Sequence, residues 1–172
     1  MKNTLKENAI ERDTANQTDI HYIEETAGLQ IFYSHSPEET YALGRRLGEA
    51  CKSGQVYTLT GDLGVGKTLF TQGFAKGLGI LEPVNSPTFT ILQIYDTGRL
   101  PFYHFDVYRI GDVEEMEEIG WEDCVYGQGV CVVEWAELIE EILPENRFRI
   151  LIEKDTEQGF DYRKITLEEV RK

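Results

Sequence analysis

Apolar residues along this chain occur in short runs whose spacing alternates between that of a strand and that of a helix. The run from Val56 to Thr60 has the apolar density of a buried strand. In the stretch from Leu69 to Leu78, Phe70 and Phe74 follow the spacing of one helix face. Gly79 is suited to end that helix. A strand, a loop and a helix in this order predict the first unit of an α/β fold.

The segment before this unit predicts another strand and helix. Residues Gln30 to Tyr33 are suited to a strand. Ser36 then stands at the N-cap position of a helix, with Pro37 in the first turn and Glu39 placed to return a hydrogen bond toward the cap. Apolar residues at helical spacing continue the helix toward Gly54.

After Pro83 the pattern becomes that of strands. The runs Thr88 to Tyr95 and Leu100 to Asp106 are separated by turn residues at positions 96–98. This arrangement predicts an antiparallel hairpin within an otherwise parallel design.

The C-terminal part contains an acidic stretch and a continuous apolar run. Asp112 to Asp123 predicts a short helix with Met116 and Ile119 inward, and its carboxylates favour a solvated face over a metal site. Val130 to Val133 is wholly apolar and is followed by Glu134, which is typical of a strand buried on both faces of a parallel sheet.

The remaining elements close the predicted domain. Ala136 to Leu143 predicts a helix that Pro144 ends. Phe148 to Glu153 and Arg163 to Leu167 predict two final strands, joined near Gln158 and Gly159.

The loop between the first buried strand and its helix carries the phosphate-binding motif. Its residues are Gly61, Asp62, Leu63, Gly64, Val65, Gly66, Lys67 and Thr68, with Leu69 next in the helix. Backbone N–H groups hold a polyphosphate where glycines permit tight turns, and the N-terminus of the helix favours the same anion. Lys67 is placed to reach the β- and γ-phosphates, and the Thr68 hydroxyl to bind Mg²⁺. Residues 61–69 are therefore predicted to bind a nucleoside triphosphate.

Together these elements predict an α/β domain of the P-loop NTPase type. We expect three layers and a mixed, mainly parallel sheet that carries antiparallel strands. The length of 172 residues suits one such domain, which we expect at residues 28–172. Residues 1–27 are polar and lack sustained periodicity, and they predict a mobile extension outside the site.

Composition and charge restrict the partners of this domain. The formal net charge of -14 would repel a bare nucleic-acid backbone, so we expect no direct DNA binding and contact with RNA only through partner proteins. Cys51, Cys124 and Cys131 lack metal-ligand spacing and suit reduced thiols. Neither a signal peptide nor a membrane span is evident, and we expect a cytoplasmic protein without membrane contact.

Three further features carry candidate chemistry. Glu134 ends its strand at the carboxyl edge of the sheet, where an acid reaches Mg²⁺ directly or through water. His104 and Asp106 alternate onto one face of their strand, and they either face the site or form a surface pair on a hairpin. Residues Ser86 to Thr88 fit either an ordinary turn or a loop that senses the γ-phosphate.

In order along the chain, these motifs resemble those of the TsaE family, also called YjeE or YdiB. They are the phosphate loop at 61–68, Ser86 to Phe89, His104 to Arg109 and Val133 to Trp135, and the helix start at Ser36 to Thr40 is similar as well. The resemblance extends from about residue 28 to the C-terminus. Val65 stands where the family more often has alanine, a change that should leave the loop working.

The resemblance implies a Mg²⁺-dependent ATPase that acts in the synthesis of threonylcarbamoyladenosine, the modified base beside the anticodon of tRNAs that read codons starting with A. It implies TsaB and TsaD as partner proteins, with the tRNA handled by those partners. ATP would then be the substrate of this chain, in agreement with its acidic charge.

The resemblance also implies the role of individual residues. Lys67 would hold the β- and γ-phosphates, and Thr68 and Glu134 would hold Mg²⁺. Asp106 would orient the attacking water, and Thr88 would be a switch-like contact. These are the expected catalytic and metal-binding residues.

Other positions have looser expectations. Ser36 and Gly159 are expected near the adenine, since both ends of the domain should flank the loop. Trp135 either packs beside the nucleotide, reports on partner docking or belongs to the core.

Two other functions fit parts of the pattern. A small-molecule kinase would use the same loop but generally brings several arginines over the phosphates, whereas Arg99 and Arg109 are the only arginines between residues 47 and 146. A docking module would bind ATP to shape a surface, with little turnover. A GTPase is disfavoured because no guanine-recognition motif follows the loop.

Overall fold

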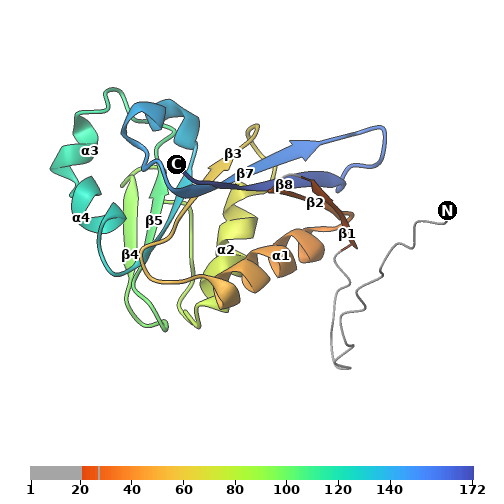
Figure 1. The fold of residues 1–172 in the computed structure, drawn as a ribbon, viewed down its shortest axis with the longest axis horizontal. Coiled ribbons are helices and arrows are strands. Elements are labelled where there is room, and N and C mark those ends of the chain that lie inside the picture. The colour runs from red at the N-terminus through yellow and green to blue at the C-terminus, as the bar shows by residue number, and fades with distance from the viewer. Residues whose placement is uncertain (1–20, 27) are drawn as a thin grey trace.

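The computed structural model describes residues 21–26 and 28–172, which form one eight-stranded sheet with helices packed against it (Figure 1). The strands are β1 (His21–Thr26), β2 (Leu29–Ser34), β3 (Val56–Thr60), β4 (Leu92–Tyr95), β5 (Phe102–Asp106), β6 (Val130–Glu134), β7 (Arg147–Lys154) and β8 (Arg163–Val170). The helices are α1 (Pro37–Ala50), α2 (Lys67–Gly77), α3 (Glu115–Glu118), α4 (Trp121–Val125) and the 3₁₀ helix η1 (Ala136–Ile142). The strand order is β1-β2-β8-β7-β3-β6-β5-β4.

The sheet is parallel at its centre and antiparallel on both sides. β3 pairs in parallel with β7 and β6, and β6 pairs in parallel with β5. The pairs β1-β2, β2-β8, β7-β8 and β4-β5 are antiparallel. The α/β fold with a mixed sheet is therefore confirmed. Within the described chain, however, three strand pairs are parallel and four are antiparallel, so parallel pairing does not predominate as expected. The antiparallel pairs include neighbours joined by a hairpin, such as β4 and β5, and also β2 and β8, which are far apart in the chain.

The ordered sheet begins before residue 28. β1 pairs antiparallel with β2, from His21 opposite Tyr33 to Thr26 opposite Leu29. Backbone hydrogen bonds along an edge do not require an apolar repeat, so the polar composition of this segment did not reveal the strand. The rest of the expected extension, residues 1–20 and 27, lies outside the described residues.

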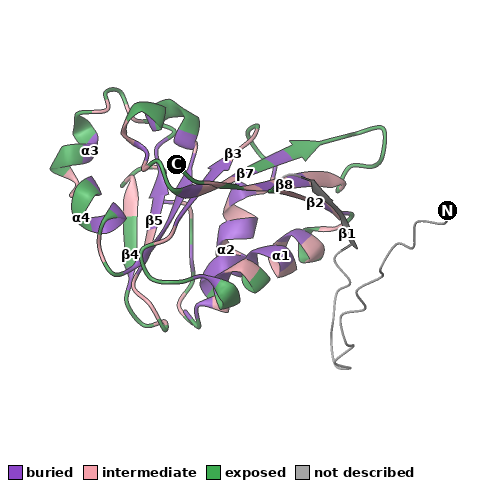
Figure 2. Ribbon diagram, viewed as in Figure 1, coloured by how far each residue is buried: buried purple, intermediate pink, exposed green. Residues whose placement is uncertain are grey.

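Two buried clusters make the sheet the middle of three layers (Figure 2). α1 and α2 pack on one face, around Phe70 and Phe74. α3, α4 and η1 pack on the other, around Met116 and Trp121. All residues of β6 are buried, which confirms the predicted strand with two covered faces.

Glycines allow α1 and α2 to approach closely. A Cβ atom on Gly44 of α1 would lie 2.1 Å from the carbonyl oxygen of Phe70, and one on Gly73 of α2 would lie 2.0 Å from that of Tyr41. α1 and α2 are neighbours in the fold (Figure 1), and these close approaches leave no space between their backbones. The phosphate loop, which leads directly into α2, shares this support.

The predicted strand from Thr88 is shorter than expected. Regular pairing starts only at Leu92, because the chain before it forms a turn in which the N–H of Ile91 donates to the carbonyl oxygen of Pro87 at 2.6 Å. Ile91 has a positive φ of 63°, which is uncommon for a β-branched residue. The turn carries Thr88 away from the sheet edge and toward β5.

Two predicted helices are also irregular. The acidic helix expected at 112–123 is divided into α3 and α4 by Gly120, whose φ of 78° is left-handed. Met116 is buried as predicted, and Ile119 packs at the edge of the same cluster. The helix expected at 136–143 is the 3₁₀ helix η1, with non-helical dihedrals at Ile139.

The start of α1 closely follows its prediction. The Ser36 hydroxyl accepts a hydrogen bond from the N–H of Glu39 at 3.2 Å. The Glu39 carboxylate accepts one from the N–H of His35, one residue before the cap, at 2.7 Å.

Within the described ranges, no helix has both the length and the apolar character needed to cross a membrane.

Candidate functional site

The loop between β3 and α2 has a backbone that only glycine adopts easily. Gly61, Gly64 and Gly66 have φ values of 141°, 71° and 111°. A Cβ atom at Gly61 would also lie 2.3 Å from the carbonyl oxygen of Ile152. The glycine spacing of the motif thus matches a backbone requirement at each position, and the loop brings the N-terminus of α2 to the carboxyl edge of the parallel strands.

A hollow of about 320 Å³ lies beside this loop. Its walls come from the loop, the first turn of α2, the turn before β4 and the ends of β5 and β6. The lining residues are Leu63, Gly64, Gly66, Lys67, Thr68, Leu69, Ser86, Thr88, Asp106, Tyr108, Glu134 and Trp135. Most of the predicted loop residues, together with Thr88, Asp106 and Glu134, therefore meet at one place.

Lys67 is held in the loop by three contacts. Its Nζ donates to the carbonyl oxygens of Gly61 at 2.6 Å and Asp62 at 2.9 Å, and lies 3.8 Å from the centre of the Trp135 ring. Burial lowers the pKa of Lys67 below its usual value, while nearby carboxylates, Glu134 first among them, act in the opposite direction. The hydrogen-bond partners of the Lys67 ammonium are neutral carbonyl oxygens, so an anionic ligand would supply the negative charge that is missing beside it.

Glu134 is buried at the end of β6 and faces α2. Its Oε2 accepts a hydrogen bond from the Thr68 hydroxyl at 3.0 Å, and its Oε1 lies 3.0 Å from the Thr71 hydroxyl. The register of β6 places Glu134 opposite Leu59 of β3 and Asp106 of β5, so three strand ends converge. Thr68 and Glu134, the two residues predicted to hold Mg²⁺, are therefore in direct contact, and their binding of the metal stays a prediction.

His104 and Asp106 are both buried, which excludes the surface pair: Asp106 lines the hollow, and His104 lies behind it against Glu134. His104 Nε2 lies 2.8 Å from Glu134 Oε1, and His104 is fully buried. On the other face of β5, Phe105 packs edge-on against Trp121 in the second core cluster. The alternation of the strand thus separates polar from apolar side chains as the sequence indicated.

Asp106 is bound by the turn that precedes β4. Its Oδ2 accepts hydrogen bonds from Ser86 Oγ at 2.5 Å and Thr88 Oγ1 at 3.0 Å, and its Oδ1 accepts one from the N–H of Tyr108 at 3.0 Å. The N–H of Asp106 in turn donates to the carbonyl oxygen of Ile91 at 2.9 Å. The Ser86 and Thr88 hydroxyls therefore lie in the hollow, at the start of the turn that Pro87 and Ile91 close. Contact of this segment with a γ-phosphate stays a prediction.

The two residues expected near the adenine do not line the hollow. Ser36 uses its hydroxyl to cap α1, and Gly159 lies in the connection between β7 and β8. The segments that carry them do flank the loop, because Arg163 Nε donates to the carbonyl oxygen of Val65 at 2.6 Å and the His35 and Tyr162 rings are 5.3 Å apart. The position of the adenine stays a prediction.

Two other predicted loop residues, Val65 and Leu63, differ in the exposure of their side chains. Val65 is buried and turns its side chain into the core cluster of α1 and α2, so only its backbone can serve a ligand. Leu63 is 72% exposed at the tip of the loop. Alanine or valine at position 65 thus changes the packing of the core and leaves the loop's binding groups, which are backbone atoms here, unaltered.

Sequence reasoning missed two side chains of the site and left a third undecided. Thr71 contacts Glu134, and its place one helical turn after Lys67 was the available signal. Tyr108 lines the hollow, and the centres of the Tyr108 and Trp135 rings are 4.7 Å apart. Trp135 has a left-handed φ of 61°, and its ring lies over Lys67. Residue spacing along a regular strand does not predict such a backbone conformation, so the position of this ring was not predictable.

The donor atoms near Thr68 suit a hard cation such as Mg²⁺. Thr68 Oγ1 and Glu134 Oε2 are oxygen atoms 3.0 Å apart beside the loop, and oxygen is the ligand type that Mg²⁺ prefers. The described part of the chain contains no cluster of three or more histidine, cysteine or carboxylate side chains that would hold a metal alone. Mg²⁺ often keeps waters and shares phosphate oxygens, so a protein site with few ligands fits it when a nucleotide is present.

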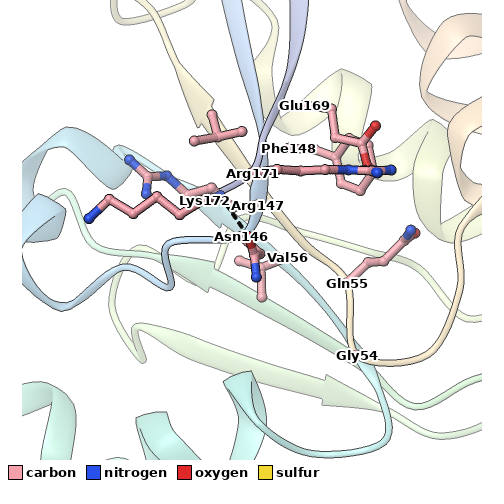
Figure 3. A pocket seen from close by; sticks show the side chains of 10 residues that line it. Gly54, Gln55, Val56, Asn146, Arg147, Phe148, Glu169, Arg171 and Lys172 are labelled. Carbon is pink, nitrogen blue, oxygen red and sulfur yellow. Dashed lines mark hydrogen bonds and ion pairs between the residues drawn. The ribbon is translucent and has the colours of Figure 1, made fainter. Parts of the chain in front are cut away.

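A second hollow, of about 350 Å³, lies at the opposite ends of β3, β7 and β8 (Figure 3). Its cationic side chains already have carboxylate partners: Arg147 pairs with Glu140, and Arg171 with Glu169 at 2.5 Å. Its glycine, Gly54, is not followed by a helix N-terminus. These features do not suit a polyphosphate, and the hollow beside the loop remains the candidate.

Comparisons with known proteins find relatives of this chain. A family model described as "Threonylcarbamoyl adenosine biosynthesis protein TsaE" matches residues 34–165. The tRNA threonylcarbamoyladenosine biosynthesis protein TsaE of Bacillus subtilis (strain 168) is 54% identical over 131 residues, which cover 76% of this chain and 80% of that protein. Its counterpart from Treponema pallidum (strain Nichols) is 48% identical over 112 residues, covering 65% of this chain and 82% of that protein.

A solved structure shares the fold. The crystal structure of Bacillus subtilis YdiB superimposes with a TM-score of 0.73 and 44% sequence identity, and covers 86% of this chain and 90% of that one. The matched residues 34–165 include the loop, the turn at 86–88 and both acidic strand ends.

Proposed function

The chain belongs to the TsaE family of threonylcarbamoyl adenosine biosynthesis proteins, and from this membership we propose that it binds and hydrolyses ATP in the formation of threonylcarbamoyladenosine on tRNA. The observation that carries the ATPase part of the proposal is the contact between Thr68 and Glu134 in front of the phosphate loop. It joins a phosphate-binding element to an acid in the position that metal-assisted phosphoryl transfer uses.

The loop and α2 are proposed to bind the phosphates. Backbone N–H groups of residues 61–68 and the N-terminus of α2 supply donors and a positive partial charge. Lys67 would exchange its carbonyl contacts with Gly61 and Asp62 for phosphate oxygens, which bind an ammonium more strongly because they are charged. Trp135 would keep the side chain over the hollow during that exchange.

Thr68 and Glu134 are proposed to hold Mg²⁺, directly or through water. When bound, Mg²⁺ neutralises charge that develops on the phosphate oxygens. The contribution of the protein is to hold both oxygen ligands in place before the nucleotide arrives, which the burial of Glu134 supports.

Asp106 is proposed to orient the attacking water, and Thr88 to act as a switch. The Asp106 carboxylate is at the wall of the hollow, where it accepts hydrogen bonds from Ser86 and Thr88. If Thr88 turned toward a γ-phosphate, one carboxylate oxygen of Asp106 would lose a partner and become available to a water molecule. The turn at 86–91 would thereby link nucleotide binding to the state of Asp106.

The partners are proposed to be proteins of the TsaB and TsaD type, in the cytoplasm, with tRNA reached through them. The net charge of -14 supports this arrangement because it opposes direct contact with RNA. Exposed apolar side chains near the hollow, Leu63 and Phe89 at 72% and 83% exposure, offer a surface for a protein partner.

Two alternatives differ from this proposal in measurable ways. A docking module would use ATP only to shape its surface. A small-molecule kinase would need arginines over the phosphates, and Arg99 is instead bound to carbonyl oxygens at the end of α1, including that of Cys51 at 2.8 Å. Arg109 stacks on Phe89 at 4.3 Å.

Steady-state ATP hydrolysis with Mg²⁺ tests the proposal, measured for this chain alone and with a purified TsaB–TsaD pair. We expect slow turnover alone and stimulation by the pair. Binding of the pair that depends on ATP but leaves the rate unchanged would favour the docking module. Absence of both binding and turnover would contradict the proposal and call for a screen of phosphoryl acceptors.

A further inference from the structure

A buried histidine contacts the acid of the site from the side away from the hollow. His104 Nε2 lies 2.8 Å from Glu134 Oε1, and the two side chains are 0% and 2% exposed. The parallel register of β5 and β6 places His104 beside Val132, two residues before the Asp106–Glu134 pair and on the same face of the sheet. His104 is absent from the lining of the hollow, so it is not placed to touch a nucleotide.

The surroundings of His104 identify which ring nitrogen carries the proton. Nε2 faces a carboxylate oxygen, which only accepts hydrogen bonds, so Nε2 must be the donor. Nδ1 is buried without a hydrogen-bond partner among the described residues. A proton on Nδ1 would therefore be a buried donor without an acceptor, which is costly. The geometry therefore places a proton on Nε2, in the hydrogen bond to Glu134.

The two oxygens of Glu134 have different partners. Oε1 lies within hydrogen-bond distance of both His104 and Thr71, at 2.8 and 3.0 Å. Oε2 contacts only Thr68 among the described residues, and Thr68 lines the hollow. The hydrogen bonds to Oε1 fix the orientation of the carboxylate, and they leave Oε2 directed toward Thr68 and the hollow.

From these contacts we infer that His104 is a positioning residue, which holds Oε1 of Glu134 so that Oε2 stays turned toward Thr68 as a cation ligand. The inference rests on the proposed function, because it gives Glu134 its metal-binding role. Partners of metal ligands commonly change metal affinity by roughly 10- to 100-fold when they are removed. A purely structural role for His104 would affect stability and leave the cation contribution intact.

The test is calorimetric binding of a non-hydrolysable ATP analogue, measured once with Mg²⁺ and once with EDTA. The ratio of the two affinities reports the contribution of the cation and does not depend on catalysis. In His104→Leu we expect this ratio to fall roughly 10- to 100-fold, with the affinity in EDTA unchanged. In His104→Gln, whose amide can donate to the same oxygen, we expect most of the ratio to return.

The matched control is Phe102→Leu. Phe102 is fully buried on the same face of β5 and stacks on His104, with ring centres 6.0 Å apart, but makes no hydrogen bond to Glu134. It should lower thermal stability and keep the wild-type ratio. An unchanged ratio in folded His104→Leu, or an equal fall in Phe102→Leu, would overturn the inference. Failure of the wild-type protein to bind the analogue at all would instead overturn the proposed function.

A second measurement needs no variant, which matters if His104→Leu fails to fold. Long-range ¹H–¹⁵N spectra of the wild-type protein distinguish the protonated from the unprotonated ring nitrogen of each histidine. We expect His104 to carry its proton on Nε2. A ring with no proton on Nε2 could not donate to Glu134, and this result would refute the inference.

Discussion

At the scale of single residues, the site is a set of charged groups whose partners are mostly within the protein. Lys67 is bound to two carbonyl oxygens and covered by Trp135, and Glu134 is bound by hydroxyls and an imidazole. Buried groups with such partners are positioned before a ligand arrives, which lowers the cost of ordering them on binding. Substitutions at these residues should therefore affect distinct steps.

Lys67→Ala should weaken ATP binding. Loss of a charge-assisted contact to phosphate, worth about 1.5–3 kcal/mol, corresponds to roughly 10- to 100-fold in affinity. The measurement is calorimetry with Mg²⁺ and an ATP analogue. Lys76→Ala is the matched control, because it removes the same charge from an exposed position in the last turn of α2. Equal affinity in Lys67→Ala and wild type would contradict the assignment of the loop.

ATP affinity should also depend on pH through Lys67. Burial lowers the pKa of this side chain below its usual 10.5, and a bound phosphate would raise it again. Only the protonated amine attracts phosphate, so affinity should fall as the pH rises through the lowered pKa, and stay constant below it. The measurement is affinity against pH on the alkaline side, and the same slope in Lys67→Ala would contradict this origin.

Glu134→Gln should slow turnover far more than it weakens ATP binding. The amide keeps the size of the side chain, but its oxygen carries no full charge to share with Mg²⁺. Turnover and affinity are measured on the same preparation. Glu137→Gln serves as the control, since Glu137 is an exposed carboxylate near Lys67. Unchanged hydrolysis in Glu134→Gln, with the partner pair present, would remove Glu134 from the mechanism.

At the scale of elements, the position of the loop depends on how α2 packs. α1 and α2 meet through glycines, and the turn at 86–91 connects the site to β5 through Asp106 and Ile91. The first contact is rigid because no space remains between the helices. The second consists of hydrogen bonds from side-chain hydroxyls, which can be exchanged for those of a ligand.

Gly44→Ala should destabilise the protein and weaken ATP binding together. The new Cβ would meet the carbonyl oxygen of Phe70 at 2.1 Å, so α2 must move, at a cost of roughly 1–3 kcal/mol. Thermal unfolding and analogue binding measure the two effects. Arg46→Ala, at an exposed position of the same helix, should change neither. Wild-type stability in Gly44→Ala would show that the helices do not pack this closely.

At the scale of the whole molecule, the net negative charge opposes direct binding of nucleic acid. The sequence has 31 acidic residues against 17 basic ones, and the described basic side chains are frequently paired with carboxylates, as in Arg45–Glu49 and Arg149–Glu168. A surface of this kind repels a phosphate backbone at moderate distances. Contact with tRNA should therefore require a protein that carries the opposite charge.

The chain alone should show no detectable binding to tRNA at physiological ionic strength, whereas tRNA should bind in the presence of the TsaB–TsaD pair. Fluorescence anisotropy of labelled tRNA measures both. Direct binding that weakens steeply with added salt would contradict this prediction, because such a slope reports phosphate contacts made by the chain itself.

Much of this arrangement was predictable from local pattern. The strands at 56–60 and 130–134 and the helix after Lys67 follow from apolar spacing, and the loop follows from its glycines. β1 was not predictable, because an edge strand is held by backbone pairing to β2 and needs no apolar repeat. The sequence also predicted the start of β4 at Thr88, whereas the strand begins at Leu92. The residues from Thr88 suit a strand, but the hydrogen bond between Thr88 and Asp106, which are distant in the chain, favours a turn there.

The sequence by itself determined the glycine-rich loop and the buried strand that ends in Glu134, because each depends on residues that are neighbours in the chain. It also determined the acidity of the protein, which is a simple sum of charges. Only the tertiary structure decided that His104 faces Glu134, that Thr71 completes the group and that Trp135 covers Lys67. These contacts join residues separated by 30 to 68 positions, and they depend on strand order and register, which no local pattern specifies.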